Sequence, residues 1–273
     1  MRVDVIASVV VLARKLGLVV EEPVALRSTN NVLAWLRPSM VVAKISSRAG
    51  VAANELAIAK ALSSVGAPVV PPASDVGDHL HRVAGRDVTF WKYEPQDQTS
   101  SASSMSIAMA LFDLHGALST LASMLSPPTF DIQIIDAIHF LDNQDFAPEF
   151  HVKDRYFLRQ ALNSGRETLA QIHDTHRIIH GSPHGMNILV VAGEPRFIDF
   201  ETVQVGPLEW DLAHLEPEVA DHYPAPLDVD TLAVCRLMVS ATTSTWCWAG
   251  LERGPDMRSH AEHHLATVRS ALG

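Results

Sequence analysis

Residues 187–199 read NILVVAGEPRFID, two short apolar runs on either side of a Gly-Glu-Pro turn. This pattern is typical of a β-hairpin, because β-branched and aromatic residues favour strands whereas Gly and Pro favour turns. A hairpin of this length folds the chain back on itself, so we expect Asn187 at its start and Asp199 at its end to lie side by side. This hairpin is the strand-like exception in a C-terminal part whose apolar residues otherwise recur at helical spacing.

An amide oxygen beside a carboxylate is a ligand pair that suits Mg²⁺, a hard cation that takes few protein ligands and completes its shell with water and phosphate. Asn187 and Asp199 are therefore candidate metal ligands. Upstream, Lys44 stands in an expected strand and Glu55 in the helix that follows. An ion pair between these two residues would hold the lysine against phosphate oxygens.

Helical and strand-like segments alternate over about the first 95 residues, which predicts a small α+β lobe. The expected elements are an amphipathic helix at residues 1–18, a hairpin of VLAWL and MVVAKI around Arg37, Pro38 and Ser39, a helix at residues 50–65, and strands at residues 69–93 with turns at VGDHL and AGRDV. A Ser-rich linker at residues 96–106 follows, and then mainly helices: residues 107–125, 131–142 and 153–174. No repeat of solenoid length is evident.

Composition excludes some classes of protein. The formal charge of the 273-residue chain is −10, so the basic surface that nucleic-acid binding requires is missing. No apolar stretch approaches the roughly 20 residues of a membrane span. The two cysteines, Cys235 and Cys247, lie in one apolar segment that is typical of a buried helix, which favours a reducing cytoplasm.

At its motifs the chain resembles the aminoglycoside phosphotransferase and choline kinase family, small-molecule relatives of the protein kinases. Lys44 and Glu55 fall where this family has its phosphate lysine and the paired helix glutamate. The resemblance covers about residue 24 to about residue 215. Three family motifs have counterparts: HGDxHxxN in HGSPHGMN at residues 180–187, IDFE or IDWE at residues 198–201, and GPxxWDLA in GPLEWDLA at residues 206–213.

The resemblance implies a role for each matched residue. Asn187 and Asp199 would hold Mg²⁺, Lys44 would bind ATP phosphates, and Glu55 would orient Lys44. Two backbone segments would complete the nucleotide site, a polar loop over the phosphates and a hinge at the adenine: Ser28, Thr29 and Asn30, followed by Trp91, Lys92, Tyr93 and Glu94. His180 and Asp211 would hold the catalytic loop in place.

Ser182 occupies the position of the family's catalytic aspartate. A general base is worth about 10² to 10⁴ in rate, whereas metal, lysine and in-line positioning supply most of the catalysis of phosphoryl transfer. The replacement therefore need not abolish the reaction. The Ser182 hydroxyl could orient the acceptor hydroxyl but cannot take its proton at neutral pH. His184 is the favoured substitute base, with Glu201 or the substrate itself as alternatives.

The competing interpretation is a nucleotide-binding pseudokinase with a sensory or partner-binding role, and a third is a deliberate replacement of the aspartate by Ser182. A zinc pair at His180 and His184 is disfavoured, because Gly181 and Pro183 make a helix improbable there.

These observations predict a protein-kinase-like bilobal α+β fold. The β-rich N-terminal lobe is residues 1–94, the helical C-terminal lobe is residues 95–273, and the hinge lies near residues 93–97. The expected function is ATP- and Mg²⁺-dependent phosphoryl transfer to a hydroxyl of a small cationic acceptor, an amino sugar, aminoglycoside-like antibiotic or amino alcohol. No nucleic-acid or membrane partner is expected, and neither the acceptor nor the oligomeric state follows from the sequence.

Overall fold

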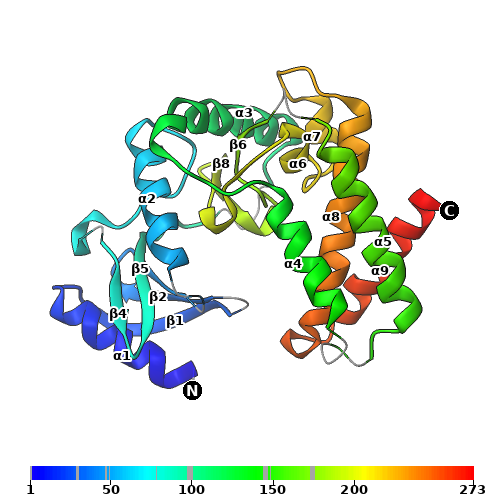
Figure 1. The fold of residues 1–273 in the computed structure, drawn as a ribbon. Coiled ribbons are helices and arrows are strands. Elements are labelled where there is room, and N and C mark those ends of the chain that lie inside the picture. The colour runs from blue at the N-terminus through cyan, green and yellow to red at the C-terminus, as the bar shows by residue number, and fades with distance from the viewer. Residues whose placement is uncertain are drawn as a thin grey trace. The chain divides into compact units, whose positions relative to one another are not determined.

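An antiparallel five-stranded sheet near the N-terminus runs in the order β1-β2-β3-β5-β4 (Figure 1). The predicted hairpin of β2 and β3 is confirmed, but its turn is Ser39 and Met40, because Arg37 and Pro38, which the sequence assigns to the turn, still belong to β2. Strand β5 pairs with β3 along its length. The strands are β1 Val20–Ser28, β2 Val32–Pro38, β3 Val41–Ile45, β4 His81–Val83 and β5 Arg86–Lys92.

The structure is a computed structural model. It describes residues 2–28, 31–46, 48, 50–77, 79–96, 101–143, 147, 149–172 and 176–273. Two compact units are formed, one from Met1–Leu125 with Met186–Thr202 and the other from Ser126–Gly185 with Val203–Gly273. The predicted lobe boundary between residues 94 and 95 stays a prediction.

In the first unit, α1 (Arg2–Lys15) packs on β1, β2 and β4 and buries one face of the sheet (Figure 1). Val41, Ala43 and Ile45 belong to this core, together with Val9 of α1. Successive side chains of a strand point to opposite faces. Lys44 therefore points away from the α1 core, and this is the face on which its partners lie.

Helix α2 (Val51–Ser64) follows β3, and helix α3 (Ser104–Thr120) begins after the Ser-rich segment. Ser103 caps α3, because its hydroxyl accepts a hydrogen bond from the Ser106 N–H. Helix α2 has no such side-chain cap, but its N-cap residue Gly50 donates its N–H to the Asp87 carboxylate of β5 at 3.2 Å. That bond fixes the start of α2 against the sheet.

The prediction of strands from residue 69 onward is wrong for residues 69–75, the part before the predicted turn at VGDHL. In these residues the structure has isolated bridges at Val69 and Pro72 and the start of the short 3-10 helix Ser74–Val76. Pro71 and Pro72 supply no backbone N–H, so the segment cannot form a continuous ladder.

The predicted hairpin is confirmed as β7 (Ile188–Val191) and β8 (Glu194–Phe197). It belongs to the first unit, where Phe197 donates to the Pro68 carbonyl and accepts from Val70. The buried Phe200 begins the 3-10 helix Phe200–Thr202, which contacts α2. The chain after the hairpin is thus held against α2.

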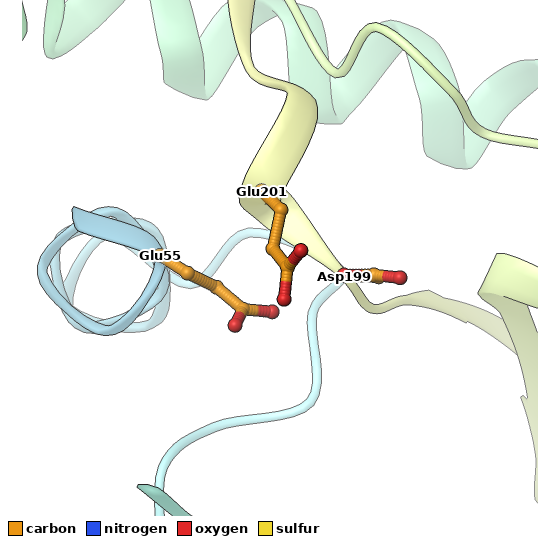
Figure 2. A group of neighbouring side chains, drawn as sticks. All are labelled: Glu55, Asp199 and Glu201. Atoms are coloured by element: carbon orange, nitrogen blue, oxygen red, sulfur yellow. The ribbon is translucent and has the colours of Figure 1, made fainter. Parts of the chain in front are cut away.

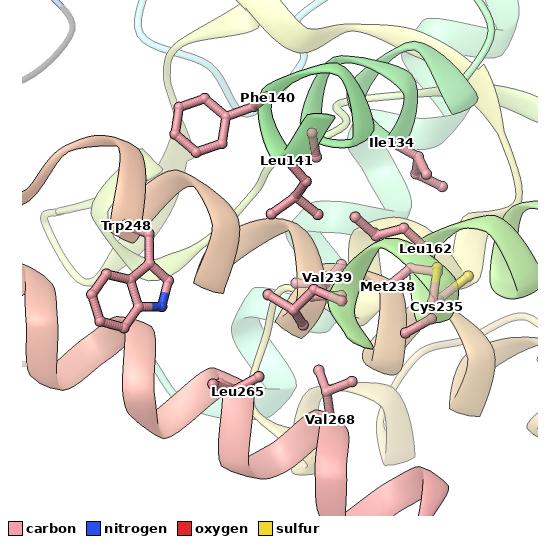
Figure 3. Close-up of a cluster of buried hydrophobic side chains, with 14 of the residues drawn as sticks. Ile134, Phe140, Leu141, Leu162, Cys235, Met238, Val239, Trp248, Leu265 and Val268 are labelled. Carbon is pink, nitrogen blue, oxygen red and sulfur yellow. The ribbon is translucent and has the colours of Figure 1, made fainter. Parts of the chain in front are cut away.

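The second unit is mainly helical, as predicted, and its core joins α4, α5, α8 and α9 (Figure 3). Cys235 and Cys247 are free thiols within α8. No described helix combines the length and apolar character that a bilayer span requires. The helices are α4 Asp131–Asp142, α5 Val152–Leu169, α6 Leu208–Leu212, α7 Pro217–Asp221, α8 Val229–Ala249 and α9 Met257–Leu272.

A strand pair that the sequence interpretation did not include joins β6 (Arg177–Ile179) to β9 (Gln204–Gly206). The strands are three residues each, too short for a clear alternating pattern. They flank the two ends of the segment that contains HGSPHGMN and the hairpin. The loop at residues 180–184 therefore begins from a paired strand.

Candidate active site

Lys44 is surrounded by three carboxylates in the first unit. Its Nζ lies 2.7 Å from Glu55 Oε1, 2.8 Å from Asp199 Oδ1 and 2.8 Å from Glu201 Oε1. One oxygen from each acid lies within 4.8 Å of the others. Figure 2 shows Glu55 arriving from α2, with its carboxylate directed toward that of Glu201. The ion pair of Lys44 and Glu55 that the sequence suggests is therefore formed, and two further acids join it.

Local structure explains how these acids converge. Glu55 lies on the buried face of α2 with Leu56, Ile58 and Ala59. Asp199 has a left-handed backbone with φ of 70°, a conformation that Asp tolerates better than most residues. Such a conformation at a non-glycine residue is maintained by its surroundings and is common at functional sites.

The electrostatics of the cluster are unusual for a buried site. Burial raises the pKa of the Glu55 carboxyl to about 7, although the Lys44 ammonium opposes the shift. Burial alone would lower the pKa of Lys44, but the attraction of the three carboxylates outweighs it and the pKa lies well above its ordinary value. The Glu55 Oε2 atom is buried without a hydrogen bond to any described residue. When all three acids are ionised, they exceed the lysine by two negative charges.

The end of the hairpin brings Asn187 toward this cluster. Ile188 pairs with Phe197, and the Ile198 N–H donates to the Asn187 carbonyl at 3.0 Å. Asn187 is buried and ends the 3-10 helix Gly185–Asn187. Asn187 and Asp199 thus flank the same end of the hairpin, as the sequence predicts, and they offer amide and carboxylate oxygens.

The loop at residues 180–184 belongs to the second unit, where Asp211 holds it. The buried Asp211 carboxylate accepts from the N–H of His180 at 2.8 Å and from the N–H of Gly181 at 2.7 Å. The Gly181 carbonyl accepts from the indole N–H of Trp210 at 3.0 Å and from the amide of Gln133 at 3.3 Å. Gly181 has a φ of 87°, which favours glycine.

Ser182 and His184 follow from this fixed backbone. The Ser182 N–H donates to His180 Nδ1 at 3.3 Å, and His180 is fully buried. Ser182 and His184 are each half-buried, so their side chains retain access to solvent. Both therefore have the exposure that contact with an acceptor molecule requires.

His214, which the sequence interpretation missed, is a half-buried residue beside this loop whose imidazole Nε2 atom is buried. Burial lowers its pKa to about 4, against the attraction of Asp211, and His184 and His180 lower it further. Its Nε2 has no hydrogen-bond partner among the described residues. His214 directly follows the WDLA motif, and nothing in the sequence there indicates that its pKa is lowered.

We expect His214 to make the folded state sensitive to acid. Its folded pKa is below the ordinary value of about 6.5, so between pH 6.5 and 4 the unfolded chain binds more protons and stability is lost as pH falls. The loss between pH 7.5 and pH 5 is roughly 2 kcal/mol. Urea denaturation of wild type and His214→Gln at both values measures it, with the exposed His260→Gln as control. An equal pH dependence in wild type and His214→Gln would contradict this assignment.

Residues 21–232 match the model of the phosphotransferase enzyme family. The chain belongs to this family. Membership confirms the prediction of a small-molecule phosphotransferase, and it extends beyond the motifs to most of the chain. No curated protein sequence matches this phosphotransferase.

Solved structures confirm the kinase-like fold. The amicoumacin kinase hAmiN in complex with AMP-PNP, Ca²⁺ and Ami is 13% identical with a TM-score of 0.74, over 99% of this chain and 96% of that one. Choline kinase LicA from Streptococcus pneumoniae is 18% identical with a TM-score of 0.67, over 96% and 97%. Spectinomycin phosphotransferase APH(9)-Ia with ADP and spectinomycin is 14% identical with a TM-score of 0.66, over 97% and 93%. At these identities the likeness shows the fold.

Two backbone N–H groups of the predicted hinge already form hydrogen bonds with other segments of the phosphotransferase. The Lys92 N–H donates to the Pro71 carbonyl at 3.0 Å, and the Tyr93 N–H donates to the Met40 carbonyl at 2.9 Å. Trp91 is buried within β5, with its indole N–H on Thr89. No other described residue accepts a backbone hydrogen bond from the Glu94 N–H. The assignment of this segment to adenine binding stays a prediction.

The predicted phosphate loop lies between β1 and β2. Ser28 ends β1, while Thr29 and Asn30 lie outside the described residues. Asn31 is the last residue of the predicted phosphate loop RSTNN at residues 27–31, although no contact of its side chain was predicted. Asn31 is buried, and its amide donates to Glu201 Oε1 at 2.8 Å.

Proposed function

We propose that this phosphotransferase transfers the γ-phosphoryl group of ATP to a hydroxyl of a small cationic molecule, such as an amino sugar, an aminoglycoside-like antibiotic or an amino alcohol. The observation that carries the proposal is Lys44 held by Glu55, Asp199 and Glu201 in a chain of this family. The names of its structural relatives, a choline kinase and two antibiotic kinases, support the substrate class.

In this proposal Lys44 binds phosphate oxygens and Glu55 fixes its direction. A lysine in β3 paired with a glutamate of the next helix is the arrangement that protein kinases use for the same purpose. Ser28, Thr29 and Asn30 cover the phosphates with their backbone, and the Glu94 N–H binds the adenine. The nucleotides in the titles of the relatives are AMP-PNP and ADP.

Asn187 and Asp199 would hold Mg²⁺. The residues fit such an ion, because the carboxylates of the cluster carry an excess of negative charge, offer oxygen ligands only, and include Glu55 Oε2, which has no hydrogen bond to another described residue. A bound Mg²⁺ would neutralise charge on the transferring phosphoryl group. The protein's own contribution is to hold these oxygens and Lys44 in place before the nucleotide binds.

Ser182 and His184 would act on the acceptor hydroxyl. Asp211 fixes the backbone before Ser182, which lets the Ser182 hydroxyl orient the acceptor by a hydrogen bond. His184 would take the proton as the acceptor oxygen attaches to phosphorus and ADP leaves. This assignment explains how a chain with Ser182 at the aspartate position can remain an enzyme.

The acidic segment at residues 215–230 supports a cationic acceptor in part. Asp228 caps α8, because its carboxylate accepts from the Thr231 N–H at 2.7 Å. Glu216, Glu218, Asp221 and Asp230 are exposed and make no ion pair with another described residue. These four acids are the ones that remain for an amine of the acceptor.

The test is transfer of label from γ-labelled ATP with Mg²⁺ to a panel of amino sugars, aminoglycosides and amino alcohols. We expect at least one acceptor to gain label with the wild type. The variant Ser182→Asp then separates two cases. A large gain in turnover would identify a site weakened only at its base, whereas no gain or a loss would indicate that the serine belongs to a working site. Nucleotide binding without transfer to any acceptor would favour the pseudokinase interpretation instead.

A further inference from the structure

The peptide unit between Gly181 and Ser182 is held at both of its polar ends. Its carbonyl accepts from the Trp210 indole N–H at 3.0 Å and from Gln133 Nε2 at 3.3 Å. Its N–H donates to His180 Nδ1 at 3.3 Å. Because a peptide unit is planar and rigid, bonds at both ends leave the Cα atom of Ser182 little freedom to move.

Gln133 reaches this peptide unit from a different element of the second unit. It lies in the first turn of α4, and its side-chain amide donates to two acceptors, the Gly181 carbonyl and Gln204 Oε1, the second at 3.0 Å. A side-chain amide nitrogen has two protons, so both can be used. Gln204 is the first residue of β9 and is 1% exposed. The amide of Gln133 therefore connects α4, β9 and the loop at residues 180–184.

Backbone pairing explains why these side chains meet. Gln204 pairs with Ile179 of β6, the strand from which the loop begins. Just before α4, the Phe130 N–H donates to the Val205 carbonyl at 2.8 Å, and an isolated bridge joins the same stretch to β9. The chain that leads into α4 therefore runs along β9, and the helix begins beside Gln204.

The amide of Gln204 is oriented by its bond to Gln133. Its Nε2 atom is buried without a hydrogen bond to another described residue, which is uncommon for a buried donor. The reversed orientation would turn this nitrogen toward the donor nitrogen of Gln133. The hydrogen bond that Gln204 does make is the one that holds Gln133 in place.

We propose that Gln133 and Gln204 are positioning residues for phosphoryl transfer, which keep the peptide unit before Ser182 in place. This rests on the proposed function, in which the Ser182 hydroxyl orients the acceptor, and adds two residues to it. Neither residue touches the reacting atoms. Gln133 acts on the loop directly and Gln204 acts through Gln133. A small misplacement of an orienting group can cost a large factor in rate, so the loop benefits from being held by α4 and β9 as well as by Trp210.

The experiment measures kcat and KM for label transfer from γ-labelled ATP to whichever acceptor the wild type uses. We expect Gln133→Met, which keeps the side-chain length but removes both donors, to lower kcat about tenfold, the value of one well-placed hydrogen bond. Gln204→Met should lower kcat about threefold, because Gln133 keeps its bond to the Gly181 carbonyl. The KM for ATP should change by less than about twofold in both, since neither residue belongs to the unit that contains the lysine cluster.

A double-variant cycle with Ser182 separates positioning from a general structural role. In a Ser182→Ala background, Gln133→Met should lower kcat by less than about threefold further, because the hydroxyl that it positions is gone. Gln160→Met, the same change at an exposed position of α5, is the matched control. Thermal melting checks that each variant is folded, and Gln204→Met keeps the test valid if Gln133→Met does not fold.

The outcomes distinguish this inference from the proposed function. A wild-type kcat in Gln133→Met, or a full tenfold loss that persists in the Ser182→Ala background, would overturn the positioning roles alone. A wild-type kcat in Gln204→Met would overturn the role of Gln204. No transfer by the wild type to any acceptor would overturn the proposed function, and this inference with it.

Discussion

Asp199→Asn should abolish phosphoryl transfer while leaving the fold intact. The change removes one negative charge and one strong metal ligand from the lysine cluster, and a metal ion contributes several kcal/mol to stabilising transferring phosphate. A loss of about 4 kcal/mol corresponds to about 10³-fold in rate. Label transfer from γ-labelled ATP to whichever acceptor the wild type uses measures the effect.

Asparagine is chosen at position 199 because it removes the negative charge without disturbing the backbone conformation. Asp199 has a left-handed φ of 70°, and Asn tolerates that region about as well as Asp. Thermal melting should therefore show little change. Asp113→Asn, an exposed change on α3, is the control. Activity of Asp199→Asn within threefold of wild type would refute a metal role for this residue.

Lys44→Met should abolish activity and also destabilise the protein. The change keeps most of the side-chain volume but leaves Glu55, Asp199 and Glu201 together without a cation. Breaking a buried ion pair by removing one partner costs about 3 to 5 kcal/mol. Turnover should fall by at least about 10²-fold, the value of one preorganised electrostatic contact to a developing charge. Urea denaturation at pH 8 and the label-transfer assay check the two effects.

A second substitution tests the reason for the instability. In Lys44→Met with Glu55→Gln the most buried of the three charges is gone, so part of the lost stability should return although activity does not. Lys15→Met, at an exposed position in α1, is the control for the lysine change. If the double variant were less stable than Lys44→Met, repulsion among the acids would not be the cause.

The part of the site that follows from local pattern could be predicted from the sequence. The hairpin at residues 188–197 follows from two apolar runs around a turn, and its register brings Asn187 and Asp199 to one end. Lys44 and Glu55 were placed on a strand and the following helix, and their pairing needs only that the helix pack back on the sheet. The motifs around them indicated the family, which the match over residues 21–232 confirms.

The parts that could not be predicted depend on packing between distant segments. The bond from Asn31 to Glu201 joins residues 170 positions apart, and no periodicity in either segment encodes it. The Lys92 and Tyr93 N–H groups were predicted hinge donors, but they are used by Pro71 and Met40, carbonyls supplied by other segments. Nothing in the sequence around His214 indicates its lowered pKa, which arises because burial in the folded chain outweighs the attraction of Asp211.

The irregular stretch at residues 69–75 shows a different limit of prediction from sequence. Its valines favour strands and are the basis of the prediction, but Pro71 and Pro72 lack the N–H groups that a ladder needs. The strand preference of valine and the missing N–H groups of proline oppose each other in this segment, and the missing N–H groups have the larger effect.

Calorimetric titration of the wild-type protein with AMP-PNP, with and without Mg²⁺, tests the central claim most directly, because it examines the lysine cluster without requiring a known acceptor. The three acids exceed Lys44 by two charges when ionised, so metal-free nucleotide should be repelled. We predict binding that is at least about tenfold tighter with Mg²⁺ than without it, since 1.4 kcal/mol of metal stabilisation suffices for that ratio. Absence of nucleotide binding, or binding that is equal with and without Mg²⁺, would contradict the assignment of this cluster as a metal–nucleotide site.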